Sequence, residues 1–430
     1  MTWAVESFDG YRARVIDAEL DALLPGLPAI AIEGAKGVGK TATALKRAAS
    51  AHYLDDQQQL EVAQADVKRI LTTEPPVLID EWQRLSPVWD AVRRAVDHDP
   101  SPSRFLLTGS ASPQTPPTHS GAGRIVQLRM RPLTLSERGM RPTVSVAELL
   151  AGTSPEISGT TGIELDDYVT EILTGGFPAV RGLRDRALRT QLDSYLARIV
   201  DHDFPEMGQQ VRRPDTLRRW MEAYAAATST TASYEVIRDA ATSGQGNKPA
   251  RSTTTPYRDV LERLWVLEPV PAWQPSRNYL KRLATAPKHQ LVDPALTARL
   301  LGVGADALLS GQSAGPSIPR DGTLLGALFE SLACLNLRVY AQAAEAEVRH
   351  LRTKDGNREV DFVLVRDDAR VVAVEVKLSA TVEDSDMRHL LWLRDQLQDD
   401  LLDAVVINTG RDAYRRRDGI AVVPASLLGP

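Results

Sequence analysis

Three ionisable residues interrupt two apolar runs near the C-terminal end, in the sequence EVDFVLVRDDARVVAVEVK (residues 359–377). Asp361 lies in the first run, and Glu375 and Lys377 lie in the second. An unpaired charge inside a sheet is costly, so these residues need a partner or a function. Residues two apart on a strand share a face, and a turn at RDDAR brings the two runs side by side. The pattern therefore predicts a hairpin that gathers the three side chains.

A second group of residues that could do chemistry is the sequence GAKGVGKT (residues 34–41), which satisfies every fixed position of the pattern G-x-x-x-x-G-K-[ST]. Its glycines let backbone N–H groups turn toward phosphate oxygens. Lys40 would contact the β- and γ-phosphates of ATP, and the Thr41 hydroxyl would ligate Mg²⁺. The residues predicted to contact the nucleotide here are Gly34, Ala35, Lys36, Gly37, Val38, Gly39, Lys40, Thr41 and Ala42.

Acidic and hydroxyl side chains follow two further apolar runs. In VLIDE, three apolar residues lead to Asp80 and Glu81, which we expect at the end of a strand beside the phosphate loop. Asp80 would hold Mg²⁺ through water, and Glu81 would polarise the attacking water. In FLLTGSAS, Thr108 or Ser110 would sense the γ-phosphate from the tip of a neighbouring strand.

An arginine that neutralises transition-state charge would complete such a site. Arg124, in GRIVQLRMR, is the first candidate for an arginine finger, and Arg129 and Arg131 are its rivals. A finger that acts on a neighbouring subunit would require a homo-oligomer.

The elements that must position these residues alternate between strands and helices. We expect strands at 28–33, 74–82, 103–112 and 123–137, and helices at 41–54 and 86–100. Buried strands alternating with helices predict an α/β fold with a parallel sheet covered on both faces.

The remaining sequence predicts two more domains. Flexible segments at 113–123, 151–162 and 313–322 interrupt the chain, and we expect a P-loop ATPase domain at 1–160. A helical and winged-helix domain would span 161–318, and an α/β domain that contains the hairpin would span 319–430. Within the middle domain, arginines concentrate at 181–190 and 211–220, where they would form either a phosphate-binding face for DNA or a solvated helix face.

The composition excludes several classes of protein. A net charge of −5 excludes a chain that is basic throughout, and one cysteine, Cys334, excludes an intrachain disulfide and a thiolate zinc cluster. The N-terminus has neither a secretory nor a transit pattern. No uncharged apolar run approaches the roughly 20 residues of a membrane span. We therefore expect a soluble cytoplasmic protein with no membrane partner.

The order of these motifs resembles a widespread prokaryotic family of AAA-type ATPases that end in a domain of unknown function, of the DUF4143 type. The resemblance covers nearly the whole chain, and it implies an additional-strand P-loop fold, a winged helix and a nuclease-like end domain. It rests on GAKGVGKT, LIDEWQ, FLLTGSAS, GRIVQLRMRPLTLSE, GGFP, LVDPAL and REVDFVL with VEVK.

The hairpin itself resembles the PD-(D/E)XK nuclease core, in which an Asp precedes a Glu-x-Lys on the next strand. The resemblance implies that Asp361 and Glu375 bind Mg²⁺, that Lys377 orients the nucleophile, and that Glu330 supplies a further acid from the preceding helix. Val360 stands where the named motif has proline. The alternative is a structural set of salt bridges.

Two functions remain open from the sequence. The first is an ATP-hydrolysing enzyme whose end domain binds or cleaves DNA with Mg²⁺. The second is a nucleotide-dependent regulatory switch that binds a protein or DNA partner and has a catalytically silent end domain.

Overall fold

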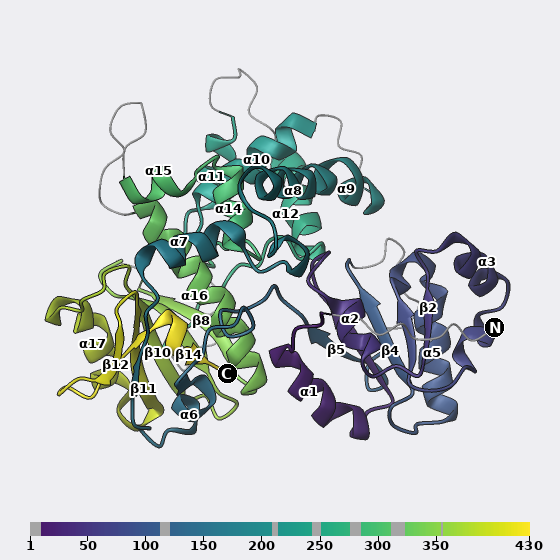
Figure 1. Ribbon diagram of the computed structural model, residues 1–430, viewed down its shortest axis with the longest axis horizontal. Helices are drawn as coiled ribbons and strands as arrows, with labels where there is room; N and C mark the ends of the chain where they lie inside the picture. Colours follow the sequence, from purple (N-terminus) through teal and green to yellow (C-terminus); the bar gives the residue numbers. More distant parts are fainter. Residues whose placement is uncertain are drawn as a thin grey trace.

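The structure is a computed structural model that describes residues 10–111, 121–208, 214–242, 251–275, 285–310, 323–353 and 356–430. Two sheet-containing lobes lie side by side, and a group of helices lies above them (Figure 1). The lobe in purple and blue contains the phosphate loop. The lobe in green and yellow contains the C-terminal hairpin. The predicted linker 313–322 and most of the predicted loop 113–123 lie outside the described residues.

The first lobe is built on a five-stranded sheet whose order is β2-β3-β4-β1-β5, with parallel pairing throughout. This order puts β4 at the centre, between β3 and β1, and brings the carboxyl ends of these three parallel strands to one edge. The strands are β1 (Ala29–Glu33), β2 (Ser50–Tyr53), β3 (Val77–Asp80), β4 (Phe105–Gly109) and β5 (Val126–Arg129). The helices are α1 (Val15–Leu23), α2 (Lys40–Leu45), α3 (Gln57–Ala65), α4 (Val67–Leu71) and α5 (Pro87–His98).

The expected helix at 41–54 is wrong in its second half. Helix α2 ends at Leu45, and residues 50–53 form strand β2, which pairs in parallel with β3. The sequence there is rich in alanine, the residue with the highest helix propensity, which explains the expectation. Pairing with β3, which is distant in sequence, overrides this local preference.

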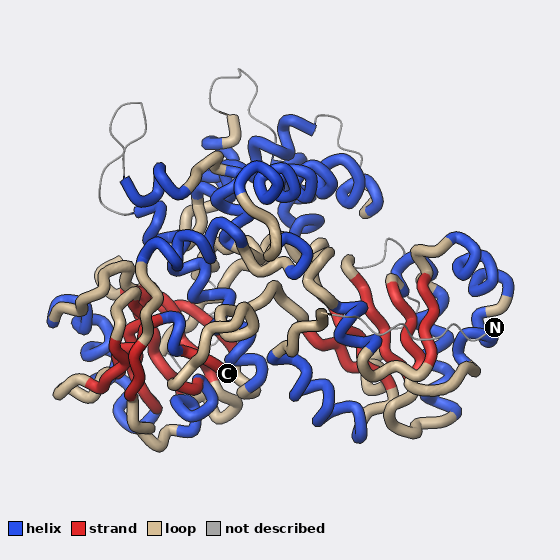
Figure 2. Tube along the Cα trace, viewed as in Figure 1, coloured by secondary structure: helices blue, strands red, loops and turns tan. Residues whose placement is uncertain are grey.

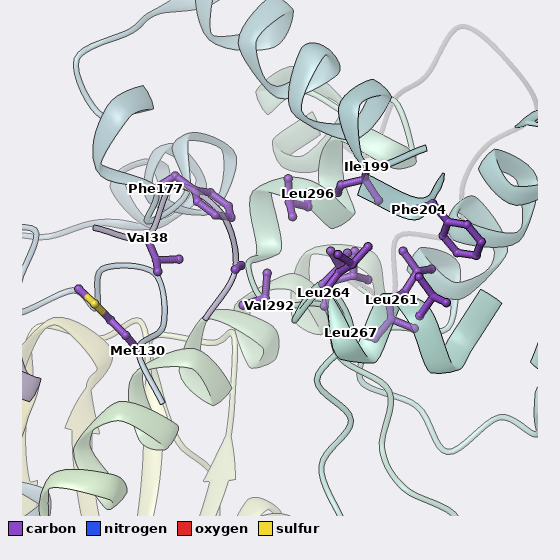
Figure 3. Packing of buried hydrophobic residues seen from close by; sticks show 14 of the residues in the cluster. Val38, Met130, Phe177, Ile199, Phe204, Leu261, Leu264, Leu267, Val292 and Leu296 are labelled. Atoms are coloured by element: carbon purple, nitrogen blue, oxygen red, sulfur yellow. The ribbon is translucent and has the colours of Figure 1, made fainter. Parts of the chain in front are cut away.

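The helices above the two lobes come from the middle of the chain. Most of them share one hydrophobic core with the phosphate-loop lobe, because Val38 and Met130 pack in the same cluster as Phe177 and Leu296 (Figure 3). The helices are α7 (Leu165–Thr174), α8 (Asp185–Arg198), α9 (Phe204–Glu206), α10 (Pro214–Ala226), α11 (Tyr234–Ala240), α12 (Arg251–Arg263), α14 (Pro294–Leu300) and α15 (Ala305–Ser310). Helix α7 instead packs in the core of the second lobe through Tyr168 and Ile172. A π-helical turn at Ile199–Asp203 joins α8 to α9.

A short antiparallel ladder follows α12. Leu267 bridges Leu291, and Val270 bridges Lys288. This ladder after three helices is the segment for which we predicted a winged helix. That assignment stays a prediction, and the polar loop at 243–250 lies outside the described residues.

The second lobe is a mixed seven-stranded sheet with the order β7-β12-β13-β11-β10-β9-β8, visible as the red strands beneath the helices in Figure 2. Strands β9 and β10 pair in antiparallel fashion, so the expected hairpin is present. The elements are α16 (Thr323–Ala343), β8 (Glu347–Arg352), β9 (Glu359–Val365), β10 (Val371–Val376), α17 (Arg388–Leu397), β11 (Leu401–Asn408), β12 (Asp412–Arg415), β13 (Ala421–Pro424) and β14 (Leu428–Gly429).

Residues 144–160 belong to this second lobe although they precede the middle helices in sequence. Strand β6 (Val144–Ser145) pairs with β14, and β7 (Ser158–Thr160) pairs with β12. Helix α6 (Val146–Ala151) lies between them, in the same lobe in Figure 1. The division at 160 and 318 remains a prediction, to which the structure adds that the chain crosses between the lobes before residue 144.

Helix α16 is the most apolar long helix in the described part of the chain. Residues 324–343 have a mean hydropathy of 1.3, and 72% of the most apolar stretch is buried inside the protein. Its length and composition are those of a membrane span, but its residues Leu328, Phe329 and Leu332 pack in the core of the second lobe. It is built as a core helix.

One acidic residue connects the two lobes. Glu268, on the first strand of the ladder, accepts a hydrogen bond from Arg131 at 2.9 Å and forms an ion pair with Arg338 of α16 at 3.1 Å. Arg129 of β5 approaches the same carboxylate at 3.7 Å. The charges of these arginines hold the pKa of Glu268 far below its usual range, against the effect of burial.

We expect Glu268→Gln to destabilise the fold strongly, by about 3–5 kcal/mol, because it leaves several largely buried guanidinium groups without a counter-charge. Chemical denaturation followed by circular dichroism measures the loss. The matched control is Glu347→Gln, which removes an acid that pairs with Arg349 on the exposed surface. Equal stability of the two variants would contradict a structural role for Glu268.

Candidate nucleotide site and the C-terminal carboxylate cluster

The phosphate loop connects the end of β1 to the start of α2. Gly39 precedes the helix with φ at 103°, a left-handed conformation that favours glycine. A side chain at Gly34 would collide with the backbone carbonyl of Met130. The loop therefore needs glycine at these positions for both conformation and close packing.

Lys40 begins α2 and turns its ammonium back over the loop. Its Nζ donates hydrogen bonds to the carbonyls of Gly34 and Ala35, each at 2.9 Å, and only 5% of the residue is exposed. Burial lowers the pKa of Lys40 to about 8. The ammonium thus lies inside the loop, at the place where the sequence pattern puts the phosphates.

The two predicted magnesium ligands of this lobe contact each other. The Thr41 hydroxyl donates to Asp80 Oδ1 at 2.8 Å, and the Thr108 hydroxyl donates to the same oxygen. Burial raises the pKa of Asp80. Thr108 lies opposite Asp80 in the parallel register of β3 and β4. Thr41 and Asp80 supply hard oxygen ligands at the mouth of the loop, so these residues fit Mg²⁺.

Glu81 follows directly and has a left-handed backbone, with φ at 52°. Its carboxylate accepts hydrogen bonds from Ser110, at 2.9 Å, and from the amide of Gln83. Each of the two hydroxyl residues proposed as sensors of the γ-phosphate therefore contacts a different acid: Thr108 contacts Asp80, and Ser110 contacts Glu81. Sequence analysis missed Gln83, although the run DEWQ places an amide two residues after the acid.

The three candidate arginines lie in different surroundings. Arg124 is roughly half exposed and pairs with Asp97 of α5 at 2.7 Å. Arg131 is held by Glu268. Arg129 is buried, lies over the Trp265 ring with its guanidinium carbon 3.9 Å from the ring centre, and has no hydrogen-bond partner among the described residues. The geometry brings none of them into hydrogen bonding with the phosphate loop, and the identity of a finger stays a prediction.

A cavity of about 560 Å³ opens beside the acidic pair. From the first lobe it is lined by Glu81, Gln83 and Ser110, and from the middle helices by Arg198 and Asp203. Its volume suits a ligand of nucleotide size.

Lys36 also lines this cavity, and it connects the phosphate loop to the middle helices. Its Nζ lies 2.5 Å from Asp203 and 3.5 Å from Glu206. Its backbone carbonyl accepts a hydrogen bond from Tyr195 of α8 at 3.2 Å. A change in the loop at Lys36 would therefore act directly on α8 and on the π-helical turn.

Two arginines of the arginine-rich segments form ion pairs. Arg181 donates two hydrogen bonds to Glu171, at 2.7 and 2.9 Å, and Arg218 pairs with Asp201 at 3.4 Å. Arg184, Arg186 and Arg189 are exposed, and residues 211–213 lie outside the described part of the chain. The choice between a DNA-binding face and a solvated helix face stays a prediction.

In the second lobe, the hairpin gathers the predicted residues. Asp361 Oδ2 accepts a hydrogen bond from the Val376 backbone at 2.9 Å, and Lys377 lies 3.4 Å from Glu375. Glu375 is buried, and burial together with the charge of Asp361 raises its pKa well above the usual value. The side chains expected to meet therefore do meet.

Sequence analysis missed the residue at the centre of this cluster. The ammonium of Lys288 lies 2.9 Å from Glu330 and 3.1 Å from Asp361, and it is almost completely buried. Among the described residues, no group of three acidic, histidine or cysteine side chains is arranged to hold a metal ion. The predicted ligands Glu330 and Asp361 bind Lys288 instead, so this cluster does not fit Mg²⁺. Lys288 stands three residues before LVDPAL, and nothing in its local sequence marked it.

Three families of known proteins match consecutive parts of the chain. Residues 27–138 match a family described as "AAA domain", 165–307 match "Domain of unknown function (DUF8612)", and 325–428 match "Domain of unknown function (DUF4143)". Uncharacterized proteins of Mycobacterium bovis and Mycobacterium tuberculosis are each 26% identical over 232 residues. That match covers 53% of this chain and 44% of each relative, so the chain spans less than half of their length.

Several solved structures are similar at low sequence identity. A Walker-type ATPase of Pyrococcus abyssi is 14% identical, with a TM-score of 0.38 over 66% of this chain and 94% of that one. The RuvB branch migration motor of Thermotoga maritima is 18% identical, with a TM-score of 0.26 over 60% and 89%. DnaA from Aquifex aeolicus, bound to AMPPCP, is 14% identical, with a TM-score of 0.25 over 60% and 97%. Because these scores are low, they carry no argument, and the similarity to AAA-type ATPases rests on the family match over residues 27–138.

The pKa of Lys40 makes nucleotide binding depend on pH. The ammonium is present below its pKa of about 8 and is lost above it. We therefore expect the affinity for ATP to be highest at about pH 7 and to fall, by up to about tenfold per unit, well above pH 8. Titration calorimetry across this range measures the effect. Lys40→Arg keeps its charge throughout, so its profile should be flat, and a flat profile in the unmodified protein would refute the assignment.

Proposed function

We propose that the protein is a magnesium-dependent ATPase that works as a nucleotide-operated switch, with its output in the middle helices. One observation carries the proposal: the buried ammonium of Lys40 lies inside the phosphate loop, and two acids lie at the end of the neighbouring strand β3. Thr41 and Thr108 bond to the first acid, Asp80, and Ser110 bonds to the second, Glu81. This is the arrangement of charges that phosphoryl transfer to water requires.

Each residue has a chemical task in this proposal. The Lys40 ammonium would exchange its two loop carbonyls for phosphate oxygens, and the N-terminal end of α2 would add a favourable dipole. Thr41 and Asp80 would hold Mg²⁺, which neutralises charge that develops on the phosphates. Glu81, held in place by Ser110 and Gln83, would orient the attacking water.

The contact between Lys36 and the middle helices supports a switch. Lys36 lies inside the phosphate loop, and its partners Asp203 and Glu206 belong to the π-helical turn and α9. Binding of an anion in the loop would alter the field at Lys36 and its hold on that turn. Of the two functions left open by the sequence, the regulatory switch also agrees with the lysine at the centre of the C-terminal carboxylates.

Partners and assembly remain part of the proposal. A protein partner of the middle helices is favoured over DNA, because Arg181 and Arg218 are paired with acids of the same chain. A homo-oligomer follows only if Arg124, which is exposed, acts on a neighbouring subunit.

Two substitutions test the ATPase proposal. We expect Lys40→Ala to weaken ATP binding by about 10- to 100-fold, because it removes charge-assisted hydrogen bonds. We expect Glu81→Gln to retain binding and to lower the rate of hydrolysis by about 10²- to 10³-fold. Phosphate release and nucleotide titration measure the two effects. Lys68→Ala, at an exposed site on α4, is the control. Undiminished hydrolysis in both variants would exclude this site.

A separate experiment tests the output. With a non-hydrolysable ATP analogue, we expect slower amide hydrogen exchange in residues 199–208, because a filled loop holds Lys36 in one position. The slowing should disappear in Lys36→Ala. Arg218→Ala, which breaks an exposed ion pair with the same turn, should retain it. The switch is refuted if Lys36→Ala responds to the analogue as the unmodified protein does.

A further inference from the structure

Lys288 is the more deeply buried of the two lysines in the C-terminal carboxylate cluster, which contains Glu330, Glu359, Asp361 and Glu375. Its side chain is 1% exposed, and its ammonium contacts Glu330 at 2.9 Å, Asp361 at 3.1 Å and Glu359 at 3.5 Å. The Phe362 ring lies 5.5 Å from the same ammonium and closes one side. The three acids come from α16 and from alternate positions of β9, so they converge on one point.

Converging carboxylates are what a divalent cation requires, and here the point of convergence is filled. The distances of 2.9 Å to Glu330 and 3.1 Å to Asp361 are those of an ammonium that donates hydrogen bonds to oxygens, and Glu359 adds an ion pair at 3.5 Å. A divalent ion would need oxygens at about 2.0–2.6 Å and would face repulsion from the ammonium. The second lysine, Lys377, lies beside Glu375 and adds positive charge at the rim.

The backbone holds Lys288 in this position. Its N–H donates to the Val270 carbonyl at 2.9 Å, and its own carbonyl accepts from Val270 at 2.8 Å. The next residue, His289, exchanges hydrogen bonds with Thr230 and Ser229, each at 2.8 Å. The backbone of Lys288 therefore belongs to a hydrogen-bonded segment of the middle region, and its side chain contacts acids of the second lobe.

We infer that Lys288 is an internal cation that takes the place of a divalent metal in the second lobe. The carboxylate cluster is then an ion-paired joint between the middle region and the C-terminal sheet, and the lobe binds no catalytic metal while Lys288 is present. This inference is independent of ATP hydrolysis, because it concerns residues outside the phosphate-loop lobe.

Binding of Mn²⁺ to the nucleotide-free full chain tests the inference, since electron paramagnetic resonance measures free Mn²⁺ directly. We expect the unmodified protein and Glu330→Gln to give the same titration. We expect Lys288→Ala to bind one additional Mn²⁺ per chain, because three carboxylates then face an open space. Adding Asp361→Asn to Lys288→Ala should abolish that binding. Thermal unfolding gives a second readout: Mn²⁺ should raise the melting temperature of Lys288→Ala and leave that of the unmodified protein unchanged.

The matched control is Lys377→Ala, which removes a neighbouring ammonium and leaves Lys288 in place. It should gain no Mn²⁺ site. The inference is overturned if the unmodified protein binds Mn²⁺ and Glu330→Gln loses it, a comparison that stands even where Lys288→Ala does not fold. It is equally overturned if folded Lys288→Ala gains no ion, or if Lys377→Ala gains the same site.

Discussion

Burial of charge at helix α16 is the constraint on which the arrangement of the lobes depends. Two clusters of opposite composition meet this helix. In one, a single acid, Glu268, is surrounded by arginines that include Arg338 of α16. In the other, a single base, Lys288, is surrounded by acids that include Glu330 of α16. Losing one partner of a buried set leaves uncompensated charge, so both clusters must form together with the fold.

The two central residues are neighbours on the same ladder. The Glu268 N–H donates to the Gln290 carbonyl at 2.9 Å, and Lys288 pairs with Val270. Their partners Arg338 and Glu330 stand about two turns apart on α16. The ladder and the helix can therefore satisfy both charges only in one register. This double pairing gives the middle region a defined position against the second lobe, which apolar packing alone would specify less sharply.

The same ladder connects to the phosphate-loop lobe. Arg131 follows β5 and bonds to Glu268, and Arg129, at the end of β5, lies on the Trp265 ring. On the other side of the loop, Lys36 and Val38 contact the middle helices through an ion pair and an apolar cluster. The phosphate loop is thus contacted by the middle region on two sides. The match of the C-terminal region to a family of unknown function adds no chemistry, because function depends on the site and not on the fold that carries it.

The sequence by itself determined the elements whose chemistry is local. A glycine-rich loop between strand and helix, the acids that end a three-residue apolar run, and an antiparallel hairpin all follow from short-range spacing and strand periodicity, and each was predicted. Strand β2 was missed because its pairing partner, β3, is remote in sequence. Lys288 was missed for a related reason: it lies 42 residues before Glu330 and 73 before Asp361. Only the tertiary structure could decide that these carboxylates surround an ammonium, because the free energy of a buried charge depends on which groups surround it in space.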